Sequence, residues 1–428
     1  MRILEKLPTS TELFSFFTSK ERSLKKDTVK IYFYQGLSVI VGIISTIFIA
    51  RTLGPKGKGI VDLFILLTGL IVEFGLLGVN SGFFFYLTNQ HKPLDQIHGS
   101  AIGYSLIFGI GVAIIGTLFI SFWQALFSGV HRNFILLAFL LTPFLFYRGL
   151  WQNLIIGINL APVGYKFQFL LTAASAVGII LLWQGRILTS RSAIYLIAGI
   201  VLLACLVSFI VLGRNNDFHL RFSKPLVSDS LRYGLKIYPG FIANFLHFRI
   251  DQLMINWFIG ASGVGLYALS VEWGEALWRI DFGIINAALY RIASQDDKNS
   301  YFLTKKVFKW VLILDGVVGL FLIVICKPLF ALLYGAKFNA SVLPLILLIP
   351  GVVAWGGGRA LSQYIAFNRG KPALCTLAAF IGMGFNIVGN LFAIPKWGIK
   401  GAAVTSTISY FLTMLFLMIV FRRKVSSP

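Results

Sequence analysis

Long apolar runs separated by short polar breaks dominate this sequence. Each run has at least 18 residues, enough for a helix to cross a hydrocarbon layer of about 30 Å. Only 13% of the residues are charged and 57% are hydrophobic, whereas soluble domains carry roughly 25% charged residues. We therefore predict an all-α integral membrane protein with about 12 transmembrane helices. The expected spans are 30–53, 59–84, 98–122, 132–156, 165–184, 192–213, 231–258, 264–290, 304–326, 341–367, 371–394 and 400–421.

The distribution of Lys and Arg between alternate loops predicts the orientation of these spans, because cytoplasmic loops retain more of them. The loops on the side of the two termini hold 23 Lys and Arg, and the other loops hold ten. Both termini are therefore expected in the cytoplasm. The net charge of +22 then follows from topology and from attraction to anionic membrane lipids, so we expect no nucleic-acid binding. We expect no cleavable signal peptide and, because every connection is short, no soluble catalytic domain.

A glycine-rich turn occurs twice in the sequence. The stretch "TLGPKGKGIVDL" follows the first span and "FIGASGVGLYAL" follows the seventh, at an offset of 206 residues. The first copy does not fit the phosphate-loop pattern G-x-x-x-x-G-K-[ST], and the second copy keeps the glycines but neither lysine. We therefore predict a tight outer turn that needs a particular backbone geometry rather than charge. The matched glycines are Gly54, Gly57 and Gly59 in the first copy and Gly260, Gly263 and Gly265 in the second.

A second match supports duplication of a six-helix unit. "IGIN" after the fourth span resembles "IAFN" after the tenth, at an offset of 209 residues. An even number of helices per copy gives both copies the same orientation, an arrangement that places a substrate site between two halves near the bilayer midplane. The expected parts are an N-terminal cytoplasmic segment (1–29), an N-lobe (30–213), a cytoplasmic linker (214–230), a C-lobe (231–421) and a cytoplasmic tail (422–428).

Two stretches resemble the polysaccharide transporter branch of the multidrug/oligosaccharidyl-lipid/polysaccharide (MOP) exporter superfamily, the Wzx-type flippases. They are "ARTLGPKGKGIVDLF" and "FNRGKP…FNIVGNLFAIPKWGIKGAAVTSTISY". The resemblance implies a MATE-like fold of two six-helix lobes around a V-shaped central cavity that alternates its access. It also implies translocation of undecaprenyl-pyrophosphate-linked glycans, such as O-antigen repeat units, from the cytoplasmic to the outer leaflet of the bacterial inner membrane.

The same resemblance leads us to expect a protein that works as a monomer in contact with membrane lipids, alongside glycan polymerase and assembly proteins. No covalent bond changes in such transport, so we expect no enzyme activity and no cofactor. The coupling ion of such a transporter would be H+ or Na+.

Four arginines lie inside predicted spans, where ionisable side chains face a bundle interior: Arg148, Arg249, Arg279 and Arg359. Guanidinium groups bind phosphate oxygens bidentately and keep their proton, which suits a pyrophosphate headgroup. The alternative is that each arginine pairs with an acid to hold helices together. The repeat offset makes Arg148 and Arg359 near-equivalent, so we expect them to face each other across the cavity. Arg279 is the weakest candidate, because Glu275 stands one turn before it and offers a pair within the same helix.

Acidic residues inside the spans are candidates for ion coupling. Asp251, with His247 one turn away, would bind H+ or Na+, unless it makes a structural contact with Arg249. Asp62 lies near the outer interface and is expected to be solvated. No cysteine or histidine spacing suggests a metal site. Further coupling candidates are Glu73, Glu272 and Glu275, and Asp281 and Asp315 are two more acids within the spans.

Two stretches are candidate hinges. Pro239 and Gly240 lie near the start of the seventh span and are expected to bend or interrupt it, as in helices that line transporter sites. Gly356, Gly357 and Gly358 are consecutive in mid-membrane, where they would form either a hinge or a seam of close helix packing. The seam is the interpretation that we favour.

The sequence leaves two other functions open. A cation-coupled multidrug exporter of the MATE type would share the fold, although helix 1 here has no acidic residue and the arginines suit an anion better. A membrane glycan polymerase or ligase would need a sizeable outer loop for its acceptor, and every outer connection is short. A flippase for a lipid-linked oligosaccharide is therefore the leading prediction.

Overall fold

The computed structural model describes residues 24–215 and 219–423. These residues form long helices and, within the described ranges, no strand. A 3₁₀ turn, η2 (Ala336–Ser341), and a π-helical turn, η3 (Tyr364–Asn368), flank α13. The helices are α2 (Leu24–Gly75), α3 (Val79–Thr88), α4 (Leu94–Leu118), α5 (Ile120–Leu126), α6 (Arg132–Leu140), α7 (Thr142–Gly157), α8 (Ala161–Gln184), α9 (Ser190–Asn215), α10 (Lys224–Phe258), α11 (Ala261–Ser294), α12 (Asp297–Tyr334), α13 (Val342–Gln363), α14 (Pro372–Trp397) and α15 (Ile399–Arg422).

Eight of the described helices are long and apolar enough to cross a membrane, or nine if the bent pair α6 and α7 counts as one span. One of them, α2, is two helices joined at a kink, because Gly54 has φ 65° and ψ −175°. Helices α10 and α11 are also long enough to cross, with 35 and 34 residues, but they carry more charge. All twelve predicted spans fall on helix. The protein is therefore a multi-pass, all-α membrane protein, as the apolar runs predicted.

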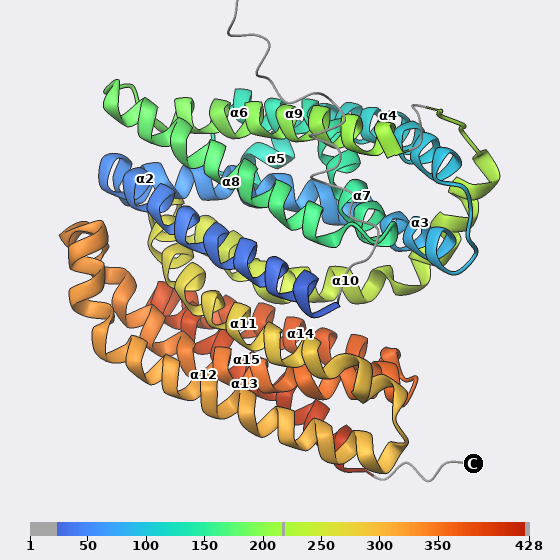
Figure 1. Cartoon of the computed structure of the whole chain (residues 1–428). Coiled ribbons are helices and arrows are strands. Elements are labelled where there is room, and N and C mark those ends of the chain that lie inside the picture. The colour runs from blue at the N-terminus through green and yellow to red at the C-terminus, as the bar shows by residue number, and fades with distance from the viewer. Residues whose placement is uncertain (1–23, 216–218, 424–428) are drawn as a thin grey trace, which may run out of the picture.

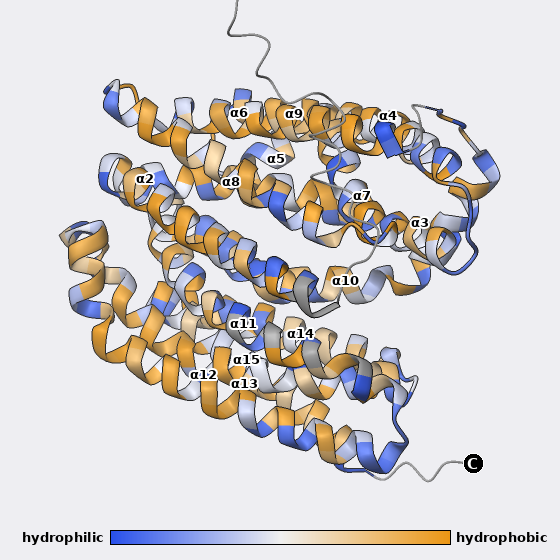
Figure 2. Cartoon of the chain, in the orientation of Figure 1, coloured by the Kyte–Doolittle hydropathy of each residue, from blue (hydrophilic) through white to orange (hydrophobic). Residues whose placement is uncertain are grey.

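Helices α2 to α9 form one bundle and α11 to α15 another, with α10 between them (Figure 1). Hydrophobic residues predominate along the helices, many large ones among them being exposed, and hydrophilic residues gather at the end where the C-terminus lies (Figure 2). Several helices break or bend inside the bundle. The second predicted span pauses between α2 and α3, where Leu77 and Gly78 have positive φ, and the fourth bends by 50° between α6 and α7.

The two matched glycine turns lie together at one end of the bundle, which we call the glycine end. Gly260, with φ 92° and ψ −177°, adopts nearly the backbone conformation of Gly54, a region that essentially only glycine occupies. Helices α2 and α11 cross here in backbone contact: a Cβ on Gly59 would overlap the Ala261 carbonyl, and a Cβ on Gly265 would overlap the Pro55 carbonyl. The prediction that these turns require a backbone geometry is confirmed.

The opposite end of the bundle has a second seam of close packing. Helix α3 lies against the first turns of α10, where Cβ atoms on Gly78 and Gly234 would each overlap the other residue's backbone. Tyr238 also donates a hydrogen bond to the Phe74 carbonyl, at 2.8 Å. The beginning of α10 is thus held by the first bundle, while its later turns pack against α14.

The expected interruption of the seventh span is not observed. Helix α10 runs from Lys224 to Phe258 with Pro239 inside it. Proline lacks the backbone donor for one helical hydrogen bond and can bend a helix, but it does not end one that its neighbours hold in place. The hinge role of Pro239 and Gly240 stays a prediction.

Candidate functional site

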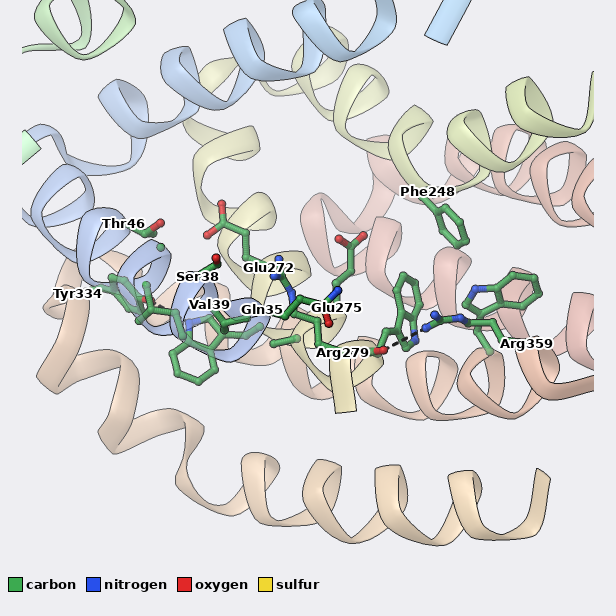
Figure 3. A pocket seen from close by; sticks show the side chains of 16 residues that line it. Gln35, Ser38, Val39, Thr46, Phe248, Glu272, Glu275, Arg279, Tyr334 and Arg359 are labelled. Carbon is green, nitrogen blue, oxygen red and sulfur yellow. Dashed lines mark hydrogen bonds between the residues drawn. The ribbon is translucent and has the colours of Figure 1, made fainter. Parts of the chain in front are cut away.

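A cavity of about 710 Å³ lies between α2 of the first bundle and α11 of the second (Figure 3). From α2 come small and polar side chains, among them Gln35, Ser38 and Thr46. Helices α10 to α13 supply a wall rich in aromatic rings. The cavity is therefore built by both halves of the chain, and the predicted duplication led us to expect a substrate site between those halves. The aromatic lining residues are Phe248, Trp273, Trp278, Tyr334 and Trp355.

Four of the predicted site residues line this one cavity: Glu272, Glu275, Arg279 and Arg359. Figure 3 shows the carboxyl groups of Glu272 and Glu275 reaching into the space from α11. Both signs of charge therefore occur in the lining. The cationic cavity that we expected is a cavity of mixed charge, and its chemistry depends on which charges are already paired.

Arg249 is paired with Glu275. The two terminal nitrogens of Arg249 donate to the two carboxylate oxygens of Glu275, at 2.6 and 3.0 Å, in a bidentate bond between α10 and α11. The expected pair of Glu275 with Arg279 is wrong, because the carboxylate turns toward the neighbouring helix instead. The expected contact of Arg249 with Asp251 is also replaced by this bond, so Arg249 joins helices and has its charge balanced.

Arg359 has a partner as well. Its guanidinium donates to the carboxylate of Asp281, at 3.0 Å, and to the carbonyl oxygen of Trp278, at 3.2 Å. The Arg359 side chain is 24% exposed and reaches the cavity, whereas the Asp281 side chain is completely buried. Arg359 thus connects the cavity to an acid inside the second bundle.

Arg279 presents its charge to the cavity without a paired acid. It is exposed on α11, and the ion pairs between described residues do not include it. The arginine that sequence spacing made the weakest candidate is therefore the one best placed to meet a ligand. The structure changes this ranking because the two acids nearest to Arg279 in sequence pair with arginines of other helices. Glu275 pairs with Arg249 of α10, and Asp281 pairs with Arg359 of α13.

Arg148 lies in a different cavity. It is on α7, donates to Gln168 of α8 at 3.2 Å and lines a space of about 270 Å³ that is bordered mainly by the first bundle. The prediction that Arg148 and Arg359 face each other across one cavity is wrong. The two spaces meet at the first span, because Gly42, Thr46 and Glu272 line both.

Lys58 of the glycine-rich turn has a role that the sequence did not indicate. Its side chain is 2% exposed and its ammonium group donates to Asp62 at 2.7 Å and to Glu272 at 2.9 Å. Glu272 belongs to α11, so this ion pair ties the two bundles together beside the Gly59 and Gly265 contact. Asp62, expected to be solvated, is 12% exposed and paired.

Asp251 and His247 belong to a polar network between α10 and the second bundle. Asp251 accepts hydrogen bonds from Tyr267, at 2.6 Å, and Ser406, at 3.1 Å, and His247 shares one with Ser409, at 3.0 Å. Both are buried and do not line the central cavity. Their role in ion coupling stays a prediction, and it would act through the packing of α10, α14 and α15.

The remaining candidates lie away from the cavity. Glu73 is half-buried on α2 and lines neither cavity described above. The three glycines of α13 are buried, and added Cβ atoms would contact side chains of α12 and α15. Close packing therefore accounts for Gly356, Gly357 and Gly358, and their role as a hinge stays a prediction.

The sequence matches the family model described as polysaccharide biosynthesis protein over residues 24–290. The chain belongs to this family. An uncharacterized membrane protein of Methanocaldococcus jannaschii is 25% identical over 205 residues, which are 46% of this chain and 39% of that relative. The match therefore spans well under half the length of that protein.

Solved structures share the fold. The lipid II flippase MurJ in an inward closed conformation has a TM-score of 0.77 at 16% identity, with 92% of this chain and 87% of that chain covered. A multidrug resistance MATE family transporter in its inward-facing conformation gives 0.72 at 13% identity, with 91% and 96% covered. A MOP superfamily transporter from Pyrococcus furiosus gives 0.64 at 13% identity, with 92% and 93% covered. The chain therefore has the fold of these transporters.

Proposed function

We propose that the chain is a flippase that moves a polyprenyl-pyrophosphate-linked oligosaccharide, such as an O-antigen or other cell-surface polysaccharide repeat unit, across the membrane by alternating access. The observation that carries the proposal is Arg279, a guanidinium that no acid among the described residues pairs with, in an aromatic-lined cavity between the two bundles. Membership of the polysaccharide biosynthesis family supports the glycan part of the substrate.

The parts of such a substrate match the parts of the cavity. Arg279 would hold the pyrophosphate through charge-assisted, bidentate hydrogen bonds. The rings of Trp273, Trp278 and Trp355 offer flat apolar faces and polar edges that suit sugar rings. The lipid tail would remain in the bilayer beside α2 and α11, which border the cavity.

The proposed orientation follows the Lys and Arg count. The termini would lie in the cytoplasm of a bacterial cell, and the glycine end would face outward. The close contact of Gly59 with Gly265 would then close the outer side in the conformation described here. The substrate would enter from the cytoplasmic leaflet and leave when the two bundles separate at the glycine end. The protein would act as a monomer beside glycan polymerase and assembly proteins, with H+ or Na+ at Asp251 as a candidate coupling ion.

A multidrug exporter is the second candidate, and one observation favours it. Glu272 and Glu275 line the cavity and their carboxylates would attract a cationic drug. Both are already paired, with Lys58 and Arg249 respectively, so among the described residues that line this cavity the charge left unpaired is that of Arg279. A membrane glycan polymerase or ligase has no specific observation in its favour.

The test is translocation of a fluorescent polyprenyl-pyrophosphate oligosaccharide in proteoliposomes, followed by chemical quenching of the outer leaflet. Loss of a charge-assisted hydrogen bond costs about 1.5–3 kcal/mol, so Arg279→Ala should lower transport at limiting substrate roughly 10-fold or more. Arg279→Lys keeps the charge and should retain part of the activity. Arg132→Ala, on an exposed arginine of α6, is the matched control. Wild-type transport by Arg279→Ala would refute the role of Arg279, and efflux of cationic drugs without glycan transport would favour the exporter.

A further inference from the structure

Two buried aspartates meet beneath the cavity. Asp281 of α11 and Asp315 of α12 both have side chains with 0% exposure. They converge on α13 at Gly356, where an added Cβ would lie 2.7 Å from Oδ2 of Asp281 and closer still to Oδ2 of Asp315. Because Gly356 has no side chain, the two carboxyl groups fit against α13 and face each other there. Arg359 follows one turn later on the same helix.

The donors around the two carboxyl groups do not suffice for two carboxylates. Arg359 donates to Oδ1 of Asp281, while Oδ2 of Asp281 and both oxygens of Asp315 have no donor among the described residues. Buried carboxylate oxygens without donors are costly, and two facing carboxylates cannot both stay ionised. Oδ2 of each aspartate faces the same point beside Gly356, and a hydrogen bond between the two groups exists only when one of them carries a proton.

We propose that Asp281 and Asp315 are a proton-binding site, and that its proton controls whether Arg359 is available to an anion in the cavity. Asp281 is the ionised member, because Arg359 contacts it, and Asp315 carries the proton and donates it to Oδ2 of Asp281. The site differs from the Asp251 network, which joins α10 to α11 and α15.

The charges facing the pair set the sign of the coupling. Among the described residues, Arg359 is the charged group of α13 that faces the pair. The two carboxyl groups come from α11 and α12, and Val311 of α12 is an apolar neighbour. Removal of the proton would put two negative charges opposite Arg359 and draw it away from the cavity. A further proton would remove the negative charge of Asp281 from beside Arg359, so each added proton favours an anion beside Arg359.

Binding linkage is reciprocal, so an anion that reaches Arg359 must also favour proton uptake by the pair. This part rests on the proposed function, because it needs an anionic headgroup in the cavity. The presence of the proton on Asp315 does not depend on any substrate. The two parts are therefore tested separately, on the full chain purified into lipid nanodiscs.

The first experiment detects the proton. Infrared spectra at neutral pH, in H2O and D2O, report the C=O stretch of protonated carboxyl groups. Asp315→Asn, whose amide can donate to Asp281 as the acid does, should remove one such band, whereas Asp95→Asn at the partly buried Asp95–Arg221 pair should remove none. Asp315→Ser supplies a donor hydroxyl if the Asn variant fails to fold. An unchanged band in a folded Asp315 variant would overturn the proton site.

The second experiment measures binding of inorganic pyrophosphate as a function of pH. In the wild type the affinity should rise as the pH falls, by up to about tenfold per pH unit for one linked proton. In Asp315→Asn this slope should flatten. Equal slopes in both proteins would overturn the link to Arg359. If the infrared band is lost as expected but pyrophosphate does not bind at any pH, the proton site stands, and the link and the proposed anionic substrate both fail.

Discussion

Substitution of Gly59 by alanine should open the glycine end of the bundle. An added Cβ would come far inside van der Waals distance of the Ala261 carbonyl and would lie 2.9 Å from the Gly265 nitrogen. Carbon atoms pack at about 3.5–4.0 Å, and backbone atoms cannot rotate aside as a side chain would. Helices α2 and α11 must therefore move apart, by roughly 1–2 Å at their crossing.

The expected magnitude follows from the cost of overpacking, about 1–3 kcal/mol. If the cost falls on the closed conformation alone, the ratio of open to closed molecules rises roughly 5- to 150-fold. Gly265→Ala should have a similar effect, because its Cβ would overlap the Pro55 carbonyl in the same seam. The double variant should destabilise the closed conformation by less than the sum of the two single variants, because a single displacement of the helices relieves both overlaps.

The assay is alkylation of a cysteine at Thr46, which lines the cavity, by a membrane-impermeant maleimide added at the glycine end. The three native cysteines would be replaced by alanine. Gly199→Ala, where a Cβ meets nothing within 4 Å, is the matched control in the first bundle. The labelling rate should rise in Gly59→Ala and stay unchanged in Gly199→Ala. Equal rates in the two variants would refute the interpretation of the glycine seam as the closed side of the transporter.

Two further predictions concern stability. Lys58→Ala removes the cation that pairs with the buried Asp62 and with Glu272 at the cavity, so it should lower the free energy of unfolding by about 3–5 kcal/mol. Thermal unfolding measures this loss. The double variant Lys58→Met with Asp62→Leu should recover part of the lost stability. Gly356→Ala should destabilise the protein by about 1–3 kcal/mol, because its Cβ would overlap the side chains of Asp281 and Asp315. Gly358→Ala is the matched control: its Cβ would meet its nearest atom at 3.3 Å, so the same measurement should show a smaller loss of stability.

The architecture could be predicted from the sequence because it follows from the length of the apolar runs and from the repeat of the glycine-rich turn. Apolar runs long enough to cross the bilayer fix the helices, and the repeated glycines locate the turns whose conformation the structure confirms. The breaks inside spans could not be predicted in this way. The bend at Leu141 and the pause at Leu77 lie in continuous apolar sequence, where hydropathy gives no signal.

The partners of the intramembrane charges were harder to predict, because pairing is decided between helices. Spacing along α11 favoured Glu275 with Arg279, but the crossing of α10 brings Arg249 nearer to that carboxylate. The role of Lys58 was missed for the same reason: the turn was predicted to need backbone geometry rather than charge, and the second acid partner of Lys58 lies 214 residues away. Asp281 and Asp315 were visible as acids in mid-span, but only the packing at Gly356 shows that they meet.

The two halves of the predicted duplication differ in chemistry but share their contact geometry at the glycine end. Gly59 and Gly265 are equivalent positions that touch each other, so the seam at the glycine end is nearly symmetric. The charges are not: Lys58 has no counterpart in the second copy of the turn, yet its acid partner Glu272 lies in that copy's helix. A symmetric contact allows the two bundles to separate and close with little distortion of either. The asymmetric charges then determine what such a movement carries, because an ion pair across the seam must break whenever the glycine end opens.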